Sequence, residues 1–364
     1  MTGPGIDGLE IAYRRLANQH VSGSPLPDPV AVVAHHGAMQ AQEYAVAKWS
    51  VGQRTTGVTD TEVQAAIDDG RILRTHALRP TWHFIAARDI GWIQALTGPR
   101  VHAFNAYYYR THQMDDAFAA TTNALITGAL RGGNYLTRKE LAAVLAGAGI
   151  EAAGNKLAYI VLRAELDGLV ANGPMRAKQH TYALISERAP DAITLTPDEA
   201  LAELTRRYFA SHGPATVKDF AWWSSLTQSQ IMKGLALVGS GLESFELDGL
   251  RFWYAPAPAP PPPPRPDVSL LQGYDEYFVA YTATRWVSNL AGRELSAPNE
   301  NTLVHAVTVD SQVRALWRRI VEPKRQLAEL TVNGSLTATQ RKAVEKAFGR
   351  YAAFTGVPVT IAWP

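Results

Sequence analysis

The sequence predicts a mainly helical α+β protein with three repeated units and a small C-terminal α+β cap. Two observations carry this prediction. The order of helices followed by a hairpin occurs three times, and a Pro/Ala-rich segment separates the last copy from a different pattern of strands and one helix. The chain has 364 residues, 46% hydrophobic and 19% charged. This length allows about two or three domains, and this composition is typical of folded globular proteins.

The first unit is expected to cover residues 1–90. Its predicted helices are 9–20, a segment that starts at 29, 43–53 and 60–68, and its predicted strands are 71–76 and 81–86. Asp28 can cap the second of these helices, with Pro29 in the first turn. Thr59 and Glu62 have the spacing of a capping box, which predicts a helix start at this point.

The second and third units are expected at residues 91–188 and 189–255. The second has predicted helices at 117–130, 137–146 and 155–167 and predicted strands at 168–173 and 180–185. The third has predicted helices at 196–211, 217–224 and 229–237 and predicted strands at 242–247 and 251–254. A capping box opens a helix in each unit, Thr137 with Glu140 and Thr196 with Glu199.

Helices followed by a hairpin are typical of the winged helix-turn-helix, in which one helix can enter the major groove while the hairpin touches the backbone or the minor groove. Small α/β units also pack without any nucleic acid, so a single copy would leave this interpretation open. Three copies in a row favour DNA binding. The net charge is only +2, so a DNA-binding surface needs its basic residues gathered on one face.

Residues 256–266 are mostly Pro and Ala, which predicts a semi-rigid extended linker. Beyond the linker, residues 267–364 are expected to form the α+β cap. Its predicted strands are 270–281, 302–309 and 313–319, and its predicted helix is 338–353.

Composition and motifs exclude several classes of function. The absence of cysteine excludes disulfides, thiolate zinc sites and cysteine nucleophiles. The sequence has no HExxH, Walker or dinucleotide-binding glycine motif, and His35 and His36 do not form a metal set, so we expect no metal and no cofactor. A signal-peptide pattern is absent, and no stretch approaches the roughly 18 apolar residues of a membrane span. We therefore expect a cytoplasmic protein without membrane contact.

Gln40 and Gln42 are two neutral amides separated by one small residue, between two predicted helices. An amide is no strong acid or base, but it can hold a water by donating and accepting at once. Residues two apart diverge by about 200° on a helix and lie on the same side of an extended segment. A shared target therefore requires the segment to leave helical geometry near Gln40. The spacing alone favours the alternative, in which both are ordinary polar residues between helices.

Basic and polar residues gather on two predicted hairpins and in the cap. Short hairpins rich in Arg, Lys and His suit contacts with phosphate or entry into the minor groove, although exposed hairpins also carry such residues simply for solvation. The expected DNA contacts are Arg71, Arg74, Arg79, His83, Arg176, Lys178, Gln179, His180, Arg318 and Arg319.

Asp275 and Glu276 form an acidic pair that would repel phosphate if it faced DNA. The pair could bond Arg285, cap a turn or assist water activation, and a structural role is the preferred interpretation. Together with Thr81, these two residues are candidates for a layer that supports the glutamines. Trp222 and Trp223 are expected in the core, because their helix has apolar neighbours.

Several segments together resemble the AlkZ/YcaQ-type winged-helix DNA glycosylases over most of the chain. They are 37–44, 78–84, 206–216, 219–223, 270–277 and 316–319. The family's catalytic motif, glutamine, an apolar residue, then glutamine or aspartate, falls on Gln40, Ala41 and Gln42, which resembles the AlkZ branch. This chain has Pro80 where the family often has glycine, and segment 270–276 lacks the usual proline. These departures concern channel shape and substrate range rather than the reaction.

The resemblance implies a concave DNA channel formed by the three winged helices. It further implies hydrolysis of the N-glycosidic bond of N7-alkylated purines in double-stranded DNA, including bulky adducts or interstrand crosslinks from a DNA-alkylating natural product. An N7-alkylated purine is cationic, so it leaves as a neutral base without a general acid. Two amides that place a water against the sugar carbon are then sufficient. No lysine is placed for a Schiff-base step, so we expect a monofunctional enzyme.

Extruding a nucleotide costs a few kcal/mol, and a bulky intercalated adduct resists it. We therefore expect the hairpins to approach the lesion within the duplex. Two other functions remain open from the sequence. One is a non-catalytic winged-helix transcriptional regulator, but regulators usually dimerise to reach two half-sites, whereas three units in one chain favour a monomer. The other is a protein-interaction scaffold, which would not bind duplex DNA at low salt.

Overall fold

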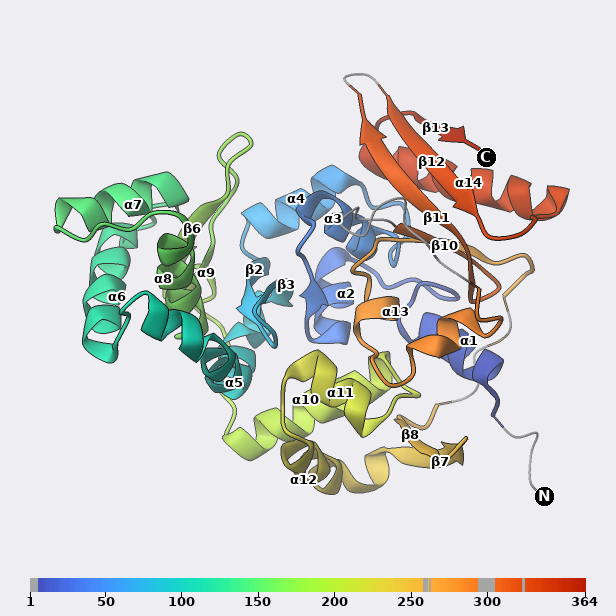
Figure 1. Cartoon of the computed structure of the whole chain (residues 1–364), viewed down its shortest axis with the longest axis horizontal. Coiled ribbons are helices and arrows are strands. Elements are labelled where there is room, and N and C mark those ends of the chain that lie inside the picture. The colour runs from blue at the N-terminus through green and yellow to red at the C-terminus, as the bar shows by residue number, and fades with distance from the viewer. Residues whose placement is uncertain (1–5, 258–260, 262, 294–304, 323–324) are drawn as a thin grey trace.

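The computed structural model describes residues 6–257, 261, 263–293, 305–322 and 325–364 (Figure 1). The first unit lies at the centre of the molecule, between the second unit on one side and the C-terminal sheet on the other, and the third unit lies beside it (Figure 1). No helix in the described part of the chain is long and apolar enough to cross a membrane.

The first unit has the helices and the hairpin that its sequence predicts. Its elements are α1 (Gly8–Asn18), α2 (Pro29–His36), β1 (Met39–Gln40), α3 (Tyr44–Gly52), α4 (Asp60–Asp68), β2 (Ile72–Ala77) and β3 (Thr81–Ala86). The Asp28 side chain accepts from the Ala31 amide at the start of α2, and Thr59 and Glu62 form a complete capping box. The predicted caps therefore fix the starts of both helices.

One strand of the first unit was not predicted. β1 pairs with β3 through Met39 with Phe84 and Gln40 with His83, so the sheet has the order β1-β3-β2. A strand of two residues shows no alternation of side chains in the sequence. Strand β1 matters for the site because it places Gln40 on extended backbone. It also leaves β3 paired along both edges, with β1 on one side and β2 on the other.

The second unit repeats the same topology. After η1 (Ala87–Asp89) and α5 (Ile90–Thr111) come α6 (Asp116–Leu130), β4 (Leu136–Thr137), α7 (Arg138–Gly147), α8 (Gly154–Leu166), β5 (Val170–Asn172), β6 (Thr181–Leu184) and α9 (Ile185–Arg188). The sheet order is β4-β6-β5, which matches the first unit. Neither β4 nor the long helix α5 was predicted from the sequence.

The third unit has α10 (Pro197–Ser211), α11 (Val217–Ser224), α12 (Gln228–Val238), η2 (Gly239–Gly241), β7 (Glu243–Leu247) and β8 (Leu250–Tyr254). Ala215, just before α11, bridges Trp253 on β8. This contact occupies the place that β1 and β4 take in the other units. The repeat inferred from the sequence is thus a repeat of strand pairing as well as of element order.

The C-terminal region differs most from its prediction. Its elements are β9 (Val268–Leu271), α13 (Glu276–Val279), η3 (Arg285–Asn289), β10 (His305–Val309), β11 (Gln312–Val321), β12 (Gln326–Val332), α14 (Ala338–Thr355) and β13 (Val359–Ala362). The predicted strand 270–281 was wrong, because the strand ends at Leu271 and a short helix follows. β12 and β13 were missed, and positions 302–304 of a predicted strand and 258–260 and 262 of the predicted linker lie outside the described residues.

The C-terminal sheet, in the order β13-β12-β11-β10-β9, shares a hydrophobic core with the first unit. The Trp49 ring on α3 packs against Tyr351 and Phe354 of α14, with ring centroids 5.2 Å apart in both contacts. Trp49 also donates from its indole nitrogen to the Leu270 carbonyl at 2.8 Å. The region therefore packs on the first unit as part of one core, and residues 270–279 of the C-terminal region reach the site described next.

Candidate active site

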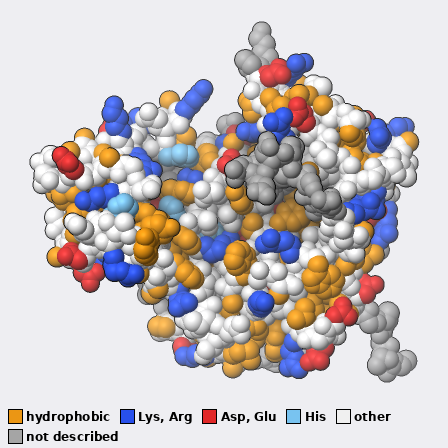
Figure 2. Space-filling model, in the orientation of Figure 1, with side chains coloured by type: hydrophobic (Ala, Val, Ile, Leu, Met, Phe, Trp, Pro, Cys, Tyr) orange, Lys and Arg blue, Asp and Glu red, His pale blue; other side chains and the backbone are white. Residues whose placement is uncertain are grey.

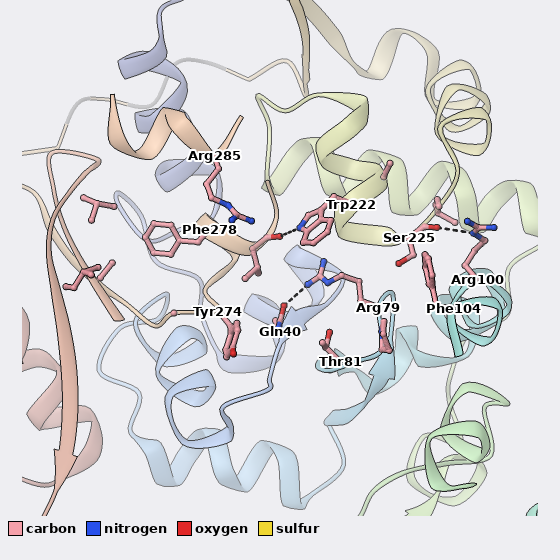
Figure 3. A pocket seen from close by; sticks show the side chains of 18 residues that line it. Gln40, Arg79, Thr81, Arg100, Phe104, Trp222, Ser225, Tyr274, Phe278 and Arg285 are labelled. Atoms are coloured by element: carbon pink, nitrogen blue, oxygen red, sulfur yellow. Dashed lines mark hydrogen bonds between the residues drawn. The ribbon is translucent and has the colours of Figure 1, made fainter. Parts of the chain in front are cut away.

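A cavity of about 980 Å³ opens where the first unit, α5, α11 and the C-terminal region meet (Figure 3). Gln40 and the turn residues Arg79 to Thr81 form one part of its wall. Aromatic side chains from three other segments face the same space, namely Phe104, Trp222, Tyr274 and Phe278. The cavity thus combines one polar corner with a broad apolar and aromatic wall, as is common in ligand sites.

Gln40 forms the polar corner, and its carboxamide is held in one orientation. Its Oε1 accepts from Arg79 Nη2 at 2.7 Å (Figure 3). A guanidinium can only donate, so the amide oxygen must face Arg79 and the amide nitrogen must face away. The Gln40 side chain is 6% exposed. Among the described residues none bonds the amide nitrogen, which leaves an N–H₂ donor and one lone pair of Oε1 for a ligand.

Glu276 holds the backbone of Gln40 from behind the cavity wall. Its Oε1 accepts from the Gln40 amide at 2.6 Å, and its Oε2 accepts from the Trp223 indole nitrogen at 2.8 Å. His212 Nε2 lies 3.3 Å from the same Oε2. Burial lowers the pKa of His212, and the contact with Glu276 opposes that shift. Glu276 is 1% exposed, so these three groups rather than solvent surround its carboxylate.

Arg79 links the same network to α11. Its Nη1 donates to the Trp223 carbonyl at 2.7 Å, while its Nη2 bonds Gln40. The residue is only 9% exposed but lines the cavity, so it is not on an exposed hairpin surface and its contact with DNA stays a prediction. Burial lowers the pKa of Arg79, and the nearby Glu276 carboxylate partly opposes this shift. The Arg79 guanidinium therefore holds the side chain of Gln40, and the Glu276 carboxylate holds its backbone.

Thr81 is a further polar group in the cavity wall. It is half-buried, and its Oγ1 is shielded from solvent without a hydrogen-bond partner among the described residues. A buried hydroxyl without a partner is uncommon, so this atom is available to a ligand or a water in the cavity.

A family model of AlkZ-like DNA glycosylases matches residues 33–354 of the chain. The chain belongs to the AlkZ-like DNA glycosylase family. The interstrand DNA cross-link repair glycosylase of Streptomyces sahachiroi is 24% identical over 365 residues, covering 94% of this chain and 95% of that protein. The solved structure of Streptomyces sahachiroi DNA glycosylase AlkZ has a TM-score of 0.79 at 22% identity, with 98% of this chain and 99% of that chain covered. At this identity the structural likeness establishes the AlkZ-like fold.

Within this AlkZ-like fold, Gln42 occupies a different environment from Gln40. The backbone is extended at Gln40, as a shared target requires, and the Ala41 amide continues the pairing by donating to the Trp82 carbonyl at 2.7 Å. Gln42 is exposed and accepts from the Trp82 amide at 3.4 Å. It is not among the residues that line the 980 Å³ cavity. The structure therefore places Gln40 in the cavity wall and Gln42 at the protein surface, and the two amides do not both face the cavity.

Asp275, the neighbour of Glu276, has a structural role. It pairs with Arg54 at 2.8 Å, and both side chains are fully buried. It also accepts from Ser50 Oγ at 2.7 Å and caps α13 through the Tyr277 amide at 3.1 Å. Of the three sequence alternatives, turn capping is thus observed, whereas pairing with Arg285 was wrong. Arg285 instead donates to the Tyr281 carbonyl and lines the cavity.

Two other expected DNA contacts are buried in this AlkZ-like fold, His83 on the central strand β3 and Arg74 on the neighbouring strand β2. His83 is fully buried, its Nδ1 lies 2.9 Å from the Thr81 carbonyl oxygen, and burial holds its pKa well below the ordinary value. Arg74 is 6% exposed, lies 4.2 Å from the Trp82 ring centroid and donates to the Ala41 carbonyl. Neither residue is exposed on the hairpin as expected. Arg74 still lines a cavity with Gln179 and His180, so its contact with DNA stays a prediction.

The remaining expected contacts are exposed or half-buried and carry local partners. Arg71 lies near Asp69, Arg176 pairs with Glu140 at 2.7 Å, and Arg318 pairs with Glu329. Arg319 is half-buried and donates to the Tyr351 hydroxyl. The three other exposed residues are Lys178, Gln179 and His180 at the tip and flank of the β5–β6 hairpin. Their contact with DNA stays a prediction.

Several cavity residues were not predicted from the sequence. Trp222 was expected in the core but is 49% exposed and donates from its indole nitrogen to the Val279 carbonyl at 3.0 Å. Arg100 and Phe104 come from α5, which was not predicted. Trp223 and His212, which support Glu276, lie in segments that carry the family resemblance, so that resemblance was the signal that could have found them. Within the described residues, no group of His, Asp and Glu side chains is arranged to hold a metal ion.

Proposed function

We propose that the chain is a monofunctional DNA glycosylase that hydrolyses the N-glycosidic bond of N7-alkylated purines in duplex DNA. The observation that carries this proposal is Gln40, whose amide faces a large cavity while Arg79 and Glu276 fix its orientation. A preorganised neutral amide suits a reaction in which water must be positioned but no proton must be supplied to the leaving group.

The reaction then proceeds with little acid–base chemistry. Alkylation at N7 gives the purine a positive charge, so bond cleavage releases a neutral base and leaves positive charge on the sugar. Gln40 Oε1 accepts a hydrogen bond from the water. Gln42, which lies outside the cavity, is included in the proposal as the second glutamine of the motif on the family resemblance alone. The charge of Arg79 is offset by Glu276, so the wall next to the developing sugar cation is close to neutral.

The cavity supports a bulky substrate. Its volume of about 980 Å³ and its aromatic wall suit an apolar substituent on N7. The Streptomyces sahachiroi relative is named an interstrand DNA cross-link repair glycosylase. We therefore extend the proposal to bulky adducts or interstrand crosslinks left by a DNA-alkylating natural product, with self-resistance or repair as the biological role.

DNA would lie in a concave channel formed by the three winged helix-turn-helix units, with the β2–β3 turn facing the lesion and the β5–β6 hairpin on the backbone. One chain contributes all three units, so a monomer on duplex DNA is proposed. The deciding experiment is incubation with duplexes that contain N7-methylguanine or a bulky N7 adduct, followed by detection of free base. Binding to duplex without base release would favour the transcriptional regulator instead.

The β5–β6 hairpin gives a prediction about salt. Replacing Arg176 and Lys178 with alanine should weaken duplex binding and reduce the slope of log affinity against log salt by about 1 for each phosphate that the hairpin no longer neutralises. Titrations at several salt concentrations measure this slope. Arg206→Ala, which removes an exposed arginine on α10, serves as the control. A slope equal to that of the unmodified protein would remove the hairpin from the interface.

Glu276 gives a prediction about positioning. Glu276→Gln keeps the size of the side chain but replaces one acceptor oxygen with an N–H₂ donor. This donor would then face another donor, either the Gln40 amide or the Trp223 indole N–H. We expect single-turnover base release to slow by about 10- to 100-fold, because small misplacements of a reacting group have effects of that order. DNA affinity should change little, and Glu246→Gln on the exposed strand β7 is the control. Unchanged release would show that Gln40 needs no support from this carboxylate.

A further inference from the structure

A second cavity, of about 360 Å³, lies between the β2–β3 hairpin, α5, α8 and β6. It shares Pro80 with the wall of the candidate active site. Its volume is at the lower end of the range of roughly 300–1,000 Å³ for ligand pockets, which suits a ligand of one or two small rings. Nothing in the proposed chemistry at Gln40 uses this cavity.

A buried carboxylate with a free acceptor forms part of its wall. Glu165 is fully buried, and its Oε2 lies 2.5 Å from His76 Nδ1. Its Oε1 is shielded from solvent and has no hydrogen-bond partner among the described residues. An unpaired buried acceptor costs about 1–3 kcal/mol, more if it is charged. A ligand that carries N–H donors would satisfy this atom.

Aromatic rings form the other walls. Tyr108 and Tyr159 are stacked, with centroids 4.8 Å apart and planes inclined by 15°. The His76 ring lies 4.0 Å from Trp82, and both of these residues line the cavity. Tyr108 is 44% exposed, and Figure 2 shows hydrophobic side chains gathered over α5, the helix that carries it. His76 and the Arg74 guanidinium, 4.2 Å from its ring centroid, already contact Trp82, so the exposed Tyr108 is the ring available for stacking. An aromatic ring beside a buried acceptor is a combination that proteins use to hold a nucleobase, by stacking and by bonding its Watson–Crick edge.

We propose that this cavity is a subsite for a guanine-type base, with the N–H edge of the base on Glu165 Oε1 and its ring against Tyr108. Guanine carries two adjacent donors, N1–H and the 2-amino group, and alkylation at N7 leaves both in place. Adenine carries a single amino donor beside an acceptor, which a carboxylate oxygen would repel. The exposed Arg138 also lines the cavity and can donate hydrogen bonds to a phosphate next to the base.

This inference rests on the proposed function and adds a base preference to it. The same guanine edge can come from two sources, a nucleotide extruded from the duplex or the base released after hydrolysis. An extruded base would overturn the expectation that the lesion is approached within the duplex. The two sources differ in when the cavity is occupied. An extruded nucleotide occupies it before the glycosidic bond is cleaved, whereas a released base occupies it only afterwards.

The test compares Tyr108→Ala with Tyr107→Ala. Both remove an exposed tyrosine from the same helix, but only Tyr108 lines the cavity. Calorimetry measures binding of 7-methylguanine and 7-methyladenine. We expect preference for 7-methylguanine, at least about fivefold weaker binding in Tyr108→Ala, and no change in Tyr107→Ala. Glu165→Gln presents a donor in place of the free acceptor and should abolish the preference. Tyr108→Ala keeps the test decisive if that buried variant fails to fold.

Single-turnover release from N7-methylguanine duplex distinguishes the sources. Slower release in Tyr108→Ala shows that the base enters before cleavage, whereas unchanged release with weaker binding of free base assigns the cavity to the product. The subsite is overturned if the unmodified protein has no preference for 7-methylguanine and neither variant alters base binding or release. Binding of 7-methylguanine without any release from duplex would instead reject the glycosylase proposal while supporting the subsite.

Discussion

Replacing Gln40 with alanine is expected to slow release of N7-alkylated guanine by at least about 100-fold, because misplacing a reacting group by 1 Å can already cost that much. The substitution removes the carboxamide that Arg79 and the cavity wall orient, and with it the group that holds the water. Arg79 Nη2 loses its acceptor, but the backbone bond from residue 40 to Glu276 and the bond from Arg79 Nη1 to the Trp223 carbonyl remain, so we expect the fold to persist. DNA affinity should therefore change little. Single-turnover release and duplex binding, measured on the same preparation, separate the two effects.

Gln42→Ala is expected to act in the same direction, and the double variant tests whether both amides serve one water. Residues that act as a unit give non-additive losses, so the double variant should be little worse than Gln40→Ala alone. Gln228→Ala, which removes an exposed glutamine at the start of α12, is the matched control. Normal release rates in the double variant would reject a catalytic role for the motif.

Local signals in the sequence located most of the helices. The capping boxes at Thr59, Thr137 and Thr196 are all formed, and the helices they open begin where predicted. Each box depends only on residues three apart, so no tertiary information is needed. By contrast, β1 and β4 have two residues each, too few for a periodic pattern.

The family resemblance pointed to Gln40, whereas the surroundings of this residue were not predictable. A target shared by two glutamines requires extended backbone at Gln40, and β1 supplies it, but Gln42 lies outside the cavity. The burial of Arg74, Arg79 and His83 could not be seen, because it arises from contacts with distant segments: His83 pairs with Gln40 on β1, Arg74 bonds the Ala41 carbonyl, and Arg79 bonds the Trp223 carbonyl. The partner of Gln40 is equally hidden, since Glu276 lies 236 residues away along the chain. Pairs at such separation leave no periodic or local trace in a single sequence.

The pair of Asp275 and Arg54 has the largest expected effect on stability. The two residues are 221 positions apart, are both fully buried, and join the C-terminal region to the first unit. Asp275→Ala leaves the Arg54 guanidinium buried without its counter-ion, which typically costs about 3–5 kcal/mol. We expect a loss of that size in the free energy of unfolding, measured by chemical denaturation. Asp198→Ala, which breaks the exposed pair with Lys233, should cost no more than about 1 kcal/mol.

The same pair predicts how stability depends on pH. Burial alone would raise the pKa of Asp275, but Arg54 and the hydrogen bonds from Ser50 and Tyr277 hold it below its ordinary value of 3.8. A carboxyl group with a lowered pKa stabilises the fold above its unfolded-state pKa, and this contribution is lost as the pH falls through the folded-state pKa. The stability difference between the unmodified protein and Asp275→Ala should therefore be constant near neutral pH and shrink below about pH 4. If this stability difference stayed constant down to strongly acid pH, the stability lost in Asp275→Ala would come from packing rather than from the charge of Asp275. The contact between the C-terminal region and the first unit would then depend on shape alone.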